Sequence, residues 1–203
     1  MKKKILTLVL FLLPLVSIIL VVIYRMTAEP SSDKVIDSLR NIEMYKSDVD
    51  YIIKNSRGTE KESTTQYYSS DKGKRIDFGE DRIKIYLEDK IIVKDNISNK
   101  TYEVEEEIDY FHKIAFLDIL LSSPITSDEI KVGQEEWGDT EYIQIDCDLI
   151  LSNDHLNTAK VFIDKNNKTP IGAIIFDKEG KERVRIVYTN FEEVKEIEEG
   201  LFY

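Results

Sequence analysis

Apolar and polar residues alternate with a period of two over most of the chain beyond residue 44. Between Tyr45 and Ile53, every second residue is apolar or small, and most of the residues between them are charged. This alternation is typical of a β-strand with one buried face. Similar runs, separated by Gly, Asp, Asn or Ser, predict a series of consecutive hairpins. The predicted strands cover residues 45–53, 63–70, 74–78, 82–87, 90–94, 101–105, 129–134, 142–151, 159–164, 170–177 and 182–191.

Two segments show helical spacing instead. The first follows Ser32 or Asp33, either of which can cap a helix, and ends near residues 41–43. The second covers residues 109–122, is apolar over more than one narrow stripe, and ends before Pro124. The apolar positions are Val35, Ile36, Leu39 and Ile42 in the first helix, and Phe111, Ile114, Phe116, Leu117, Leu120 and Leu121 in the second.

The predicted fold class is therefore α+β, with one long, curved antiparallel sheet and two helices against its concave face. A transmembrane helix is predicted to precede this domain. The charged tail at residues 192–199 is predicted to fray.

The transmembrane prediction rests on residues 5–24, which contain no charged side chain. Twenty helical residues span a bilayer core of about 30 Å. Lys2, Lys3 and Lys4 precede this segment and only Arg25 closely follows it, which orients the N-terminus toward the cytoplasm. We expect residues 1–25 to be a cytoplasmic tip and anchor, 26–32 a linker, and 33–203 an extracytoplasmic domain. Residues that mark the anchor are Ile5, Leu10, Leu15, Leu20 and Tyr24.

The alternative is a cleaved secretory signal. Its apolar core is usually about 7–15 residues long and ends at a site with small residues. The apolar run here is longer, and the best cleavage site, after Ala28, has the bulky Met26 two residues before it. Lipidation near the anchor is not expected, because the only cysteine is Cys147. A single cysteine also excludes a disulfide within the chain.

The charge of the chain limits its partners. It carries 39 acidic and 28 basic residues, for a net charge of −11. Removing the basic N-terminal tip makes the remaining domain still more acidic. Phosphate backbones repel such a domain, so we expect no nucleic-acid partner and favour a basic partner or a solvated surface.

No arrangement of residues in the sequence predicts catalysis, a metal or another cofactor. The two histidines, His112 and His155, lie outside any metal-binding or nucleophile motif, so packing or surface roles are expected. Cys147 lies between Asp146 and Asp148, whose charges disfavour the thiolate. Its position in the alternating pattern predicts a buried structural thiol. The chain is therefore not expected to be an enzyme.

The order of these features resembles the LolA/LolB-like lipoprotein-carrier superfamily. The residues that carry the resemblance are Thr169–Pro170, the turn at residues 177–180, and the strand at residues 186–191. The resemblance implies a half-barrel whose concave apolar face shelters acyl chains under a helical lid. Residues expected to line such a cavity are Tyr51, Ile53, Tyr67, Phe78, Ile85, Phe116 and Leu120. The alternative is that these side chains pack against one another.

Within this group, the size, acidity and Lys- and Asn-rich composition resemble the spore germination lipoprotein GerS. That resemblance implies a non-catalytic protein that binds and activates a zinc-dependent N-acetylmuramoyl-L-alanine amidase of the spore cortex, and it also implies a homodimer formed by strand exchange. GerS is lipid-anchored through a cysteine, whereas this chain has none near residue 25. Two functions follow as hypotheses: a membrane-anchored binding protein that activates an amidase, or a carrier of lipoproteins or acyl chains.

Overall fold

The computed structural model describes residues 16–19, 31–126, 131–133, 137–138, 140–149 and 154–203. The chain divides into two compact units, residues 1–31 and 32–203. In the first unit, residues 16–19 are helical. The predicted anchor residues Ile5, Leu10, Leu15, Leu20 and Tyr24 lie outside the described residues. Among the residues that are described, no helix has the length and apolar character needed to cross a bilayer.

The second unit contains one antiparallel sheet, which has 11 strands in the described part of the chain. Their order across the sheet is β6-β5-β4-β3-β2-β1-β11-β10-β9-β8-β7. The strands are β1 (Met44–Asn55), β2 (Gly58–Ser69), β3 (Gly73–Phe78), β4 (Arg82–Tyr86), β5 (Lys90–Asp95), β6 (Lys100–Glu105), β7 (Lys131–Gly133), β8 (Tyr142–Asp148), β9 (Thr158–Asp164), β10 (Pro170–Phe176) and β11 (Glu182–Glu193).

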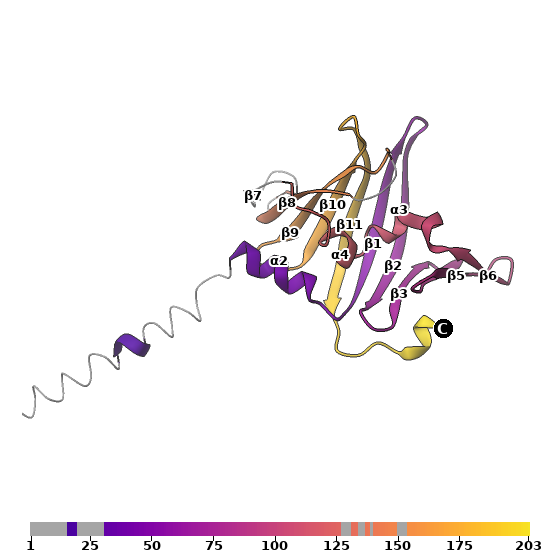
Figure 1. Ribbon diagram of the computed structural model, residues 1–203, viewed down its shortest axis with the longest axis horizontal. Helices are drawn as coiled ribbons and strands as arrows, with labels where there is room; N and C mark the ends of the chain where they lie inside the picture. The colour runs from indigo at the N-terminus through magenta and orange to yellow at the C-terminus, as the bar shows by residue number, and fades with distance from the viewer. Residues whose placement is uncertain (1–15, 20–30, 127–130, 134–136, 139, 150–153) are drawn as a thin grey trace, which may run out of the picture. The chain divides into compact units, whose positions relative to one another are not determined.

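The chain runs outward from the middle of this sheet, crosses it and returns. Strands β1 to β6 form consecutive hairpins toward one edge, and the segment after β6 crosses the concave face to the other edge. Strands β7 to β11 then lead back to the middle, where β11 pairs with β1. The predicted curved antiparallel sheet with helices on one face is confirmed (Figure 1).

Strand β2 begins earlier than the sequence predicts. Residues 58–62 are polar or charged, so they show no alternation that would mark a strand. The ladder with β1 nevertheless continues to Asn55 and Gly58. The Asn55 side chain closes the tight turn by accepting hydrogen bonds from the backbone N–H groups of Arg57 at 2.8 Å and Gly58 at 3.1 Å. Cross-strand pairing therefore extends the hairpin beyond its buried part.

Helix α2 (Ser32–Arg40) lies on the concave face and begins inside the predicted linker. It buries Val35, Ile36 and Leu39, as its spacing predicts. Since these three positions occupy one side of an α-helix, the rest of α2 remains polar and exposed.

The prediction of one helix over residues 109–122 is wrong. The segment forms a 3₁₀-helix, η1 (Glu106–Asp109), followed by the short helices α3 (Tyr110–Lys113) and α4 (Leu117–Leu120). Phe116 has extended backbone angles, φ −76° and ψ 135°, and separates α3 from α4. Four consecutive side chains, residues 114–117, are all buried. A single helix cannot bury four consecutive residues against one sheet, so a break in the helix is required.

Buried tyrosines of the sheet hold this crossing segment in place. The hydroxyls of Tyr51 and Tyr188 donate to the carbonyl oxygens of His112 at 2.9 Å and Ala115 at 2.6 Å. Tyr45 Oη accepts from the N–H of Leu117 at 3.2 Å. Burial raises the pKa of all three tyrosines well above the ordinary value, so the hydroxyls stay protonated. They satisfy backbone groups that short helices leave without partners.

The C-terminal tail is packed against the outer face of the sheet, so the prediction that residues 192–199 fray is wrong. Strand β11 continues to Glu193, and a 3₁₀-helix, η2 (Glu199–Phe202), follows. Phe202 is 2% exposed, and the Arg75 side chain donates to the carbonyl oxygen of Leu201 at 2.9 Å. The tail is rich in glutamate, but two buried apolar residues, Ile197 and Phe202, hold it in place.

The outer face carries a second, smaller apolar cluster around Phe162, which Trp137 covers. The indole ring of Trp137 lies over Gly172, where the Cβ of any larger residue would come within 2.6 Å of the ring and 2.4 Å of the Ile186 carbonyl oxygen. Glycine is therefore required at this position for the close approach of Trp137 to the sheet.

Candidate functional site

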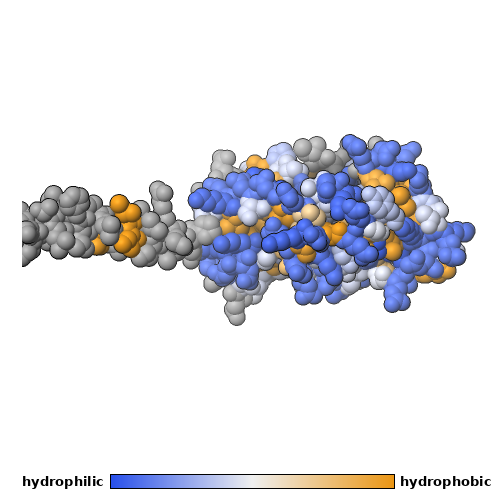
Figure 2. All heavy atoms as spheres, turned by 90° about the horizontal axis from the view of Figure 1, so that it is seen from below, coloured by the Kyte–Doolittle hydropathy of each residue, from blue (hydrophilic) through white to orange (hydrophobic). Residues whose placement is uncertain are grey.

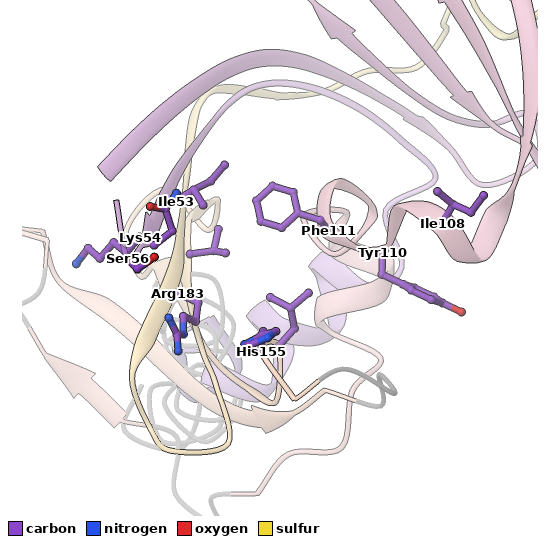
Figure 3. Close-up of a pocket in the computed structure, with 11 residues that line it drawn as sticks. Ile53, Lys54, Ser56, Ile108, Tyr110, Phe111, His155 and Arg183 are labelled. Carbon is purple, nitrogen blue, oxygen red and sulfur yellow. The ribbon is translucent and has the colours of Figure 1, made fainter. Parts of the chain in front are cut away.

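An open pocket of about 530 Å³ lies at one end of the concave face. The end of β1 and the start of β11 form one wall, the η1–α3 segment forms another, and the loop before β9 forms a third (Figure 3). Its lining consists of Ile53, Lys54, Asn55, Ser56, Ile108, Tyr110, Phe111, His155, Leu156, Arg183 and Val184.

The inner surface of the pocket is apolar, and its rim is polar. Ile53 and Phe111 lie on opposite walls, and Val184 and Leu156 complete the apolar surface. The Phe111 ring packs on Tyr51, with ring centroids 5.7 Å apart, so the pocket floor continues into the core. A cavity of this volume and lining fits an apolar chain or a large apolar side chain of a partner.

The cations at the rim are paired with carboxylates of the same protein. Arg183 Nε lies 2.6 Å from Asp177 Oδ2, and Lys54 Nζ lies 2.8 Å from Glu182 Oε2. Asp177 also accepts from the N–H of Lys181 at 2.8 Å, which closes the β10–β11 turn. These charges therefore shape the rim, while the apolar surface inside it remains open.

Of the seven residues predicted to line a cavity, only Ile53 lines this pocket. Tyr51, Phe78, Phe116 and Leu120 are buried in the main core, as the packing alternative expects. Their side chains form the layer between sheet and helices, so a cavity at the centre of the concave face is filled.

The structure corrects the placement of Tyr67 and Ile85, which lie on the outer face of the sheet. The Tyr67 ring lies beneath Lys46 Nζ at 5.5 Å and the Arg75 guanidinium at 5.8 Å. Ile85 is the cross-strand partner of Arg75 and shares its face. Tyr67 and Tyr68 are consecutive, and only the register of β2 decides that Tyr68 faces the core.

Sequence reasoning missed most of the pocket. Phe111, Ile108 and Tyr110 line it because the predicted second helix is broken, which turns its first part toward the end of the sheet. Leu156 lies in a loop and Arg183 lies at the start of a strand. At such positions the alternating pattern does not predict which way a side chain points. The one signal in the sequence was the run of four consecutive apolar residues at 114–117, which a helix with one apolar face does not need.

A polar cluster beneath α3 fixes this wall of the pocket. His112 Nδ1 lies 2.8 Å from Asp109 Oδ1, and His112 Nε2 lies 2.8 Å from Glu62 Oε2. The two ring nitrogens therefore contact carboxylates on opposite sides of the imidazole, one from η1 and one from β2. The edges of Tyr51 and Phe78 pack around the imidazole, with centroids 5.2 and 5.0 Å away. His112 therefore ties α3 to β2, beyond the packing role that the sequence predicts.

Asp109 is the most connected member of this cluster. Besides His112, its carboxylate accepts from Tyr86 Oη at 2.8 Å and contacts Lys84 Nζ. Burial opposes ionisation, but hydrogen bonds and charge from His112 and Lys84 hold the pKa of Asp109 well below its usual range. Burial and the Asp109 carboxylate raise the pKa of Tyr86 well above its ordinary value. The cluster is a charged structural joint between η1, α3 and the sheet.

Cys147 is a buried thiol, as its position in the pattern predicts. Burial, with smaller contributions from Asp146 and Asp148, raises its pKa to about 12. The thiolate is therefore disfavoured at neutral pH, and this side chain contributes packing.

Known proteins were compared with this chain by family, by sequence and by structure. A family model described as "Sporulation protein YdcC-like" matches residues 2–202. Comparison with curated protein sequences gives no match. Among solved structures, an uncharacterised conserved protein from Thermus thermophilus is similar at 12% identity and a TM-score of 0.56, covering 85% of this chain and 93% of that one. This likeness shows the fold.

Two further solved structures are similar to this chain at lower TM-scores. The LolA superfamily protein NE2245 from Nitrosomonas europaea is 7% identical, with a TM-score of 0.46 and coverage of 86% of this chain and 98% of that one. A chain of the CwlD amidase complex with the GerS lipoprotein from Clostridioides difficile is 16% identical, with a TM-score of 0.45 and coverage of 82% and 98%.

Proposed function

Because the chain belongs to the sporulation protein YdcC-like family, we propose that it is a non-catalytic, extracytoplasmic binding protein of sporulating cells. Residues 1–25 anchor it in the membrane, residues 26–32 form a linker, and residues 33–203 bind the partner. The observation that carries this proposal is the open apolar pocket with its fixed wall and internally paired rim charges. Such a surface supports recognition without supplying a reactive group.

The partner we propose is a cell-wall N-acetylmuramoyl-L-alanine amidase, which this protein binds and activates. The choice of an amidase rests on the resemblance of the sequence to GerS. An amidase surface that presents a large apolar side chain fits the pocket between Ile53 and Phe111, and the rim then supplies polar contacts around it. Activation follows if docking stabilises the active conformation of the amidase.

Two measurements test this proposal with the full chain reconstituted in detergent micelles. The affinity of the amidase from the same organism is measured by calorimetry, and its activity on peptidoglycan is measured with and without the chain. We expect binding together with a rise in activity. Phe111→Asp should weaken both, whereas Ile125→Asp, which alters an exposed residue outside the pocket lining, should change neither. An amidase that neither binds nor gains activity refutes the proposal.

A carrier of lipoproteins or acyl chains is the second candidate, and the same pocket favours it. Its volume of about 530 Å³ lies within the range of small-ligand sites. Mass spectrometry of organic extracts of the purified chain tests this function. Acyl chains recovered in a stoichiometric amount from the wild type, and reduced in Phe111→Asp, support the carrier; a clean extract counts against it.

Membrane attachment and a homodimer by strand exchange complete the proposal. Fractionation of cells that express the tagged chain tests the first, since an anchored protein stays with membranes after a high-salt wash. Light scattering on the purified chain tests the second, because strand exchange doubles the mass of the particle.

A further inference from the structure

Exposed apolar side chains are concentrated in one stretch of the chain, within β6 and the segments on either side of it. Six large hydrophobic residues of the unit at 32–203 are exposed among the residues described, and four of them fall between residues 97 and 110. These four are Ile97 at 79%, Tyr102 at 46%, Ile108 at 70% and Tyr110 at 38% exposure, while Ile125 and Tyr203 lie elsewhere. On the face of the domain that Figure 2 shows, hydrophilic residues predominate, with smaller hydrophobic areas among them. Such clustering marks an interaction surface.

Strand β6 runs through this group and is an edge strand. Within the described part of the chain it pairs with β5 alone, in an uninterrupted register from Lys90↔Glu105 to Asp95↔Lys100. It contains no proline and no bulge, two devices that commonly block a sheet edge. The backbone N–H and C=O groups along the edge of β6 that points away from β5 are therefore available to a further strand.

The two faces of β6 differ in chemistry. Tyr102 pairs with Val93, a residue of the main core, so Tyr102 and Val104 face the concave side. Glu103 and Glu105 alternate with them, so these two side chains lie on the outer face of the sheet, where they are exposed. Glu103 also accepts a hydrogen bond from Lys90 Nζ at 2.7 Å. An added strand would meet an apolar row on one face and an acidic row on the other.

We propose that the β6 edge binds an extended strand of the partner protein, in which apolar residues alternate with lysine or arginine. The apolar residues pack on Tyr102 and Val104, and the basic residues face Glu103 and Glu105. Main-chain hydrogen bonds supply the general affinity and the alternation supplies the specificity. This inference rests on the proposed function, because it assigns where the amidase docks.

Charge favours a partner strand over a second copy of this chain. In a continuous antiparallel sheet, paired residues point to the same face, so each outward residue of β6 would meet an outward residue of the other copy. In the registers that place Glu103 opposite Glu103 or Glu105 of the other copy, carboxylates would oppose each other across the new edge, and the Lys90–Glu103 ion pair within each copy would offset this repulsion only in part. Like charges directly opposite each other destabilise a strand pair. The net charge of −11 adds to this repulsion.

The test combines hydrogen–deuterium exchange with charge reversal, using the full chain in micelles and the amidase as the probe. Amidase binding should slow exchange of the amides at residues 100–105. The double variant Glu103→Lys/Glu105→Lys should bind the amidase about tenfold more weakly, equivalent to roughly 1.4 kcal/mol. The matched control, Glu192→Lys/Glu193→Lys, makes the same charge change at two exposed positions of β11 and should bind like the wild type. Unfolding temperatures verify that both variants fold.

Each outcome is decisive. Protected β6 amides together with the tenfold loss support the inference. Amidase binding without β6 protection, or an equal loss in the control, overturns the inference and leaves the proposed function standing. Absence of amidase binding by the wild type overturns both. Protection of β6 without the amidase, in a particle of doubled mass, overturns the assignment to a partner strand in favour of a second copy.

Discussion

Replacing Asp109 by asparagine tests whether the charged joint holds the pocket wall. In the wild type, the carboxylate is buried and accepts hydrogen bonds from His112 and Tyr86 beside its contact with Lys84. Asp109→Asn keeps the shape of the side chain but leaves Lys84 without its buried countercharge and removes a carboxylate that contacts His112. Removing one partner of a buried ion pair costs about 3–5 kcal/mol. Since the amide still accepts one hydrogen bond, we expect a loss near the lower limit, about 3 kcal/mol at pH 7.

The pH dependence of this loss is a second, independent expectation. The pKa of Asp109 is lowered in the folded protein, so its contribution to stability is present above the unfolded value of about 3.9 and is lost as the pH falls through the folded value. The difference between wild type and Asp109→Asn should therefore be full between about pH 5 and 7 and should shrink below about pH 4.

Urea unfolding provides the assay, because the chain contains a single tryptophan, Trp137, whose fluorescence reports on the sheet. The matched control is Asp81→Asn in the exposed β3–β4 turn, which should change stability by less than about 0.5 kcal/mol. A loss in Asp109→Asn as small as that of the control, or one that persists unchanged at about pH 3, would refute the role assigned to the joint.

Three further perturbations probe other parts of the structure. Gly172→Ala should lower stability by about 1–3 kcal/mol, since its Cβ would meet the Ile186 carbonyl and the Trp137 ring, while Gly200→Ala, with open space around it, should be neutral in thermal unfolding. Phe202→Ala should cost about 3 kcal/mol in urea unfolding if the C-terminal tail is packed, and almost nothing if the tail frays. Cys147 should resist a thiol reagent at about pH 8 in the native protein and react fully in concentrated urea; rapid native labelling would contradict its burial and raised pKa.

The sheet could be predicted from sequence because its strands have one apolar and one polar face. This alternation located β1 and the hairpins after it, and the helical spacing of two other segments indicated the layer on the concave face. It failed where pairing continues without burial, as in residues 58–62 of β2, since cross-strand hydrogen bonds leave no mark on hydropathy. It also failed at Tyr67 and Tyr68. Because two tyrosines follow each other, the pattern does not determine which of them faces the core.

The pocket could not be predicted, because its walls depend on tertiary contacts. The break at Phe116 results from packing against the sheet, and Asp109 and His112 meet Glu62 and Lys84 from distant strands. Local charge likewise suggested a frayed tail, although two apolar residues, Ile197 and Phe202, are buried and hold it against the sheet. Residues that act through long-range contacts therefore formed most of the difference between expectation and structure.

The pairing of the first strand with the last has a consequence for how the domain is made. Ser47 of β1 bonds to Thr189 of β11, which is 142 positions later in the chain. During synthesis or export from the N-terminus, β1 to β6 can assemble as local hairpins, but one side of β1 stays open until β11 emerges. Such distant pairing slows folding because loop-closure entropy must be overcome first. The sheet therefore stays incomplete, with one edge of β1 unpaired, until the last strand of the domain is available.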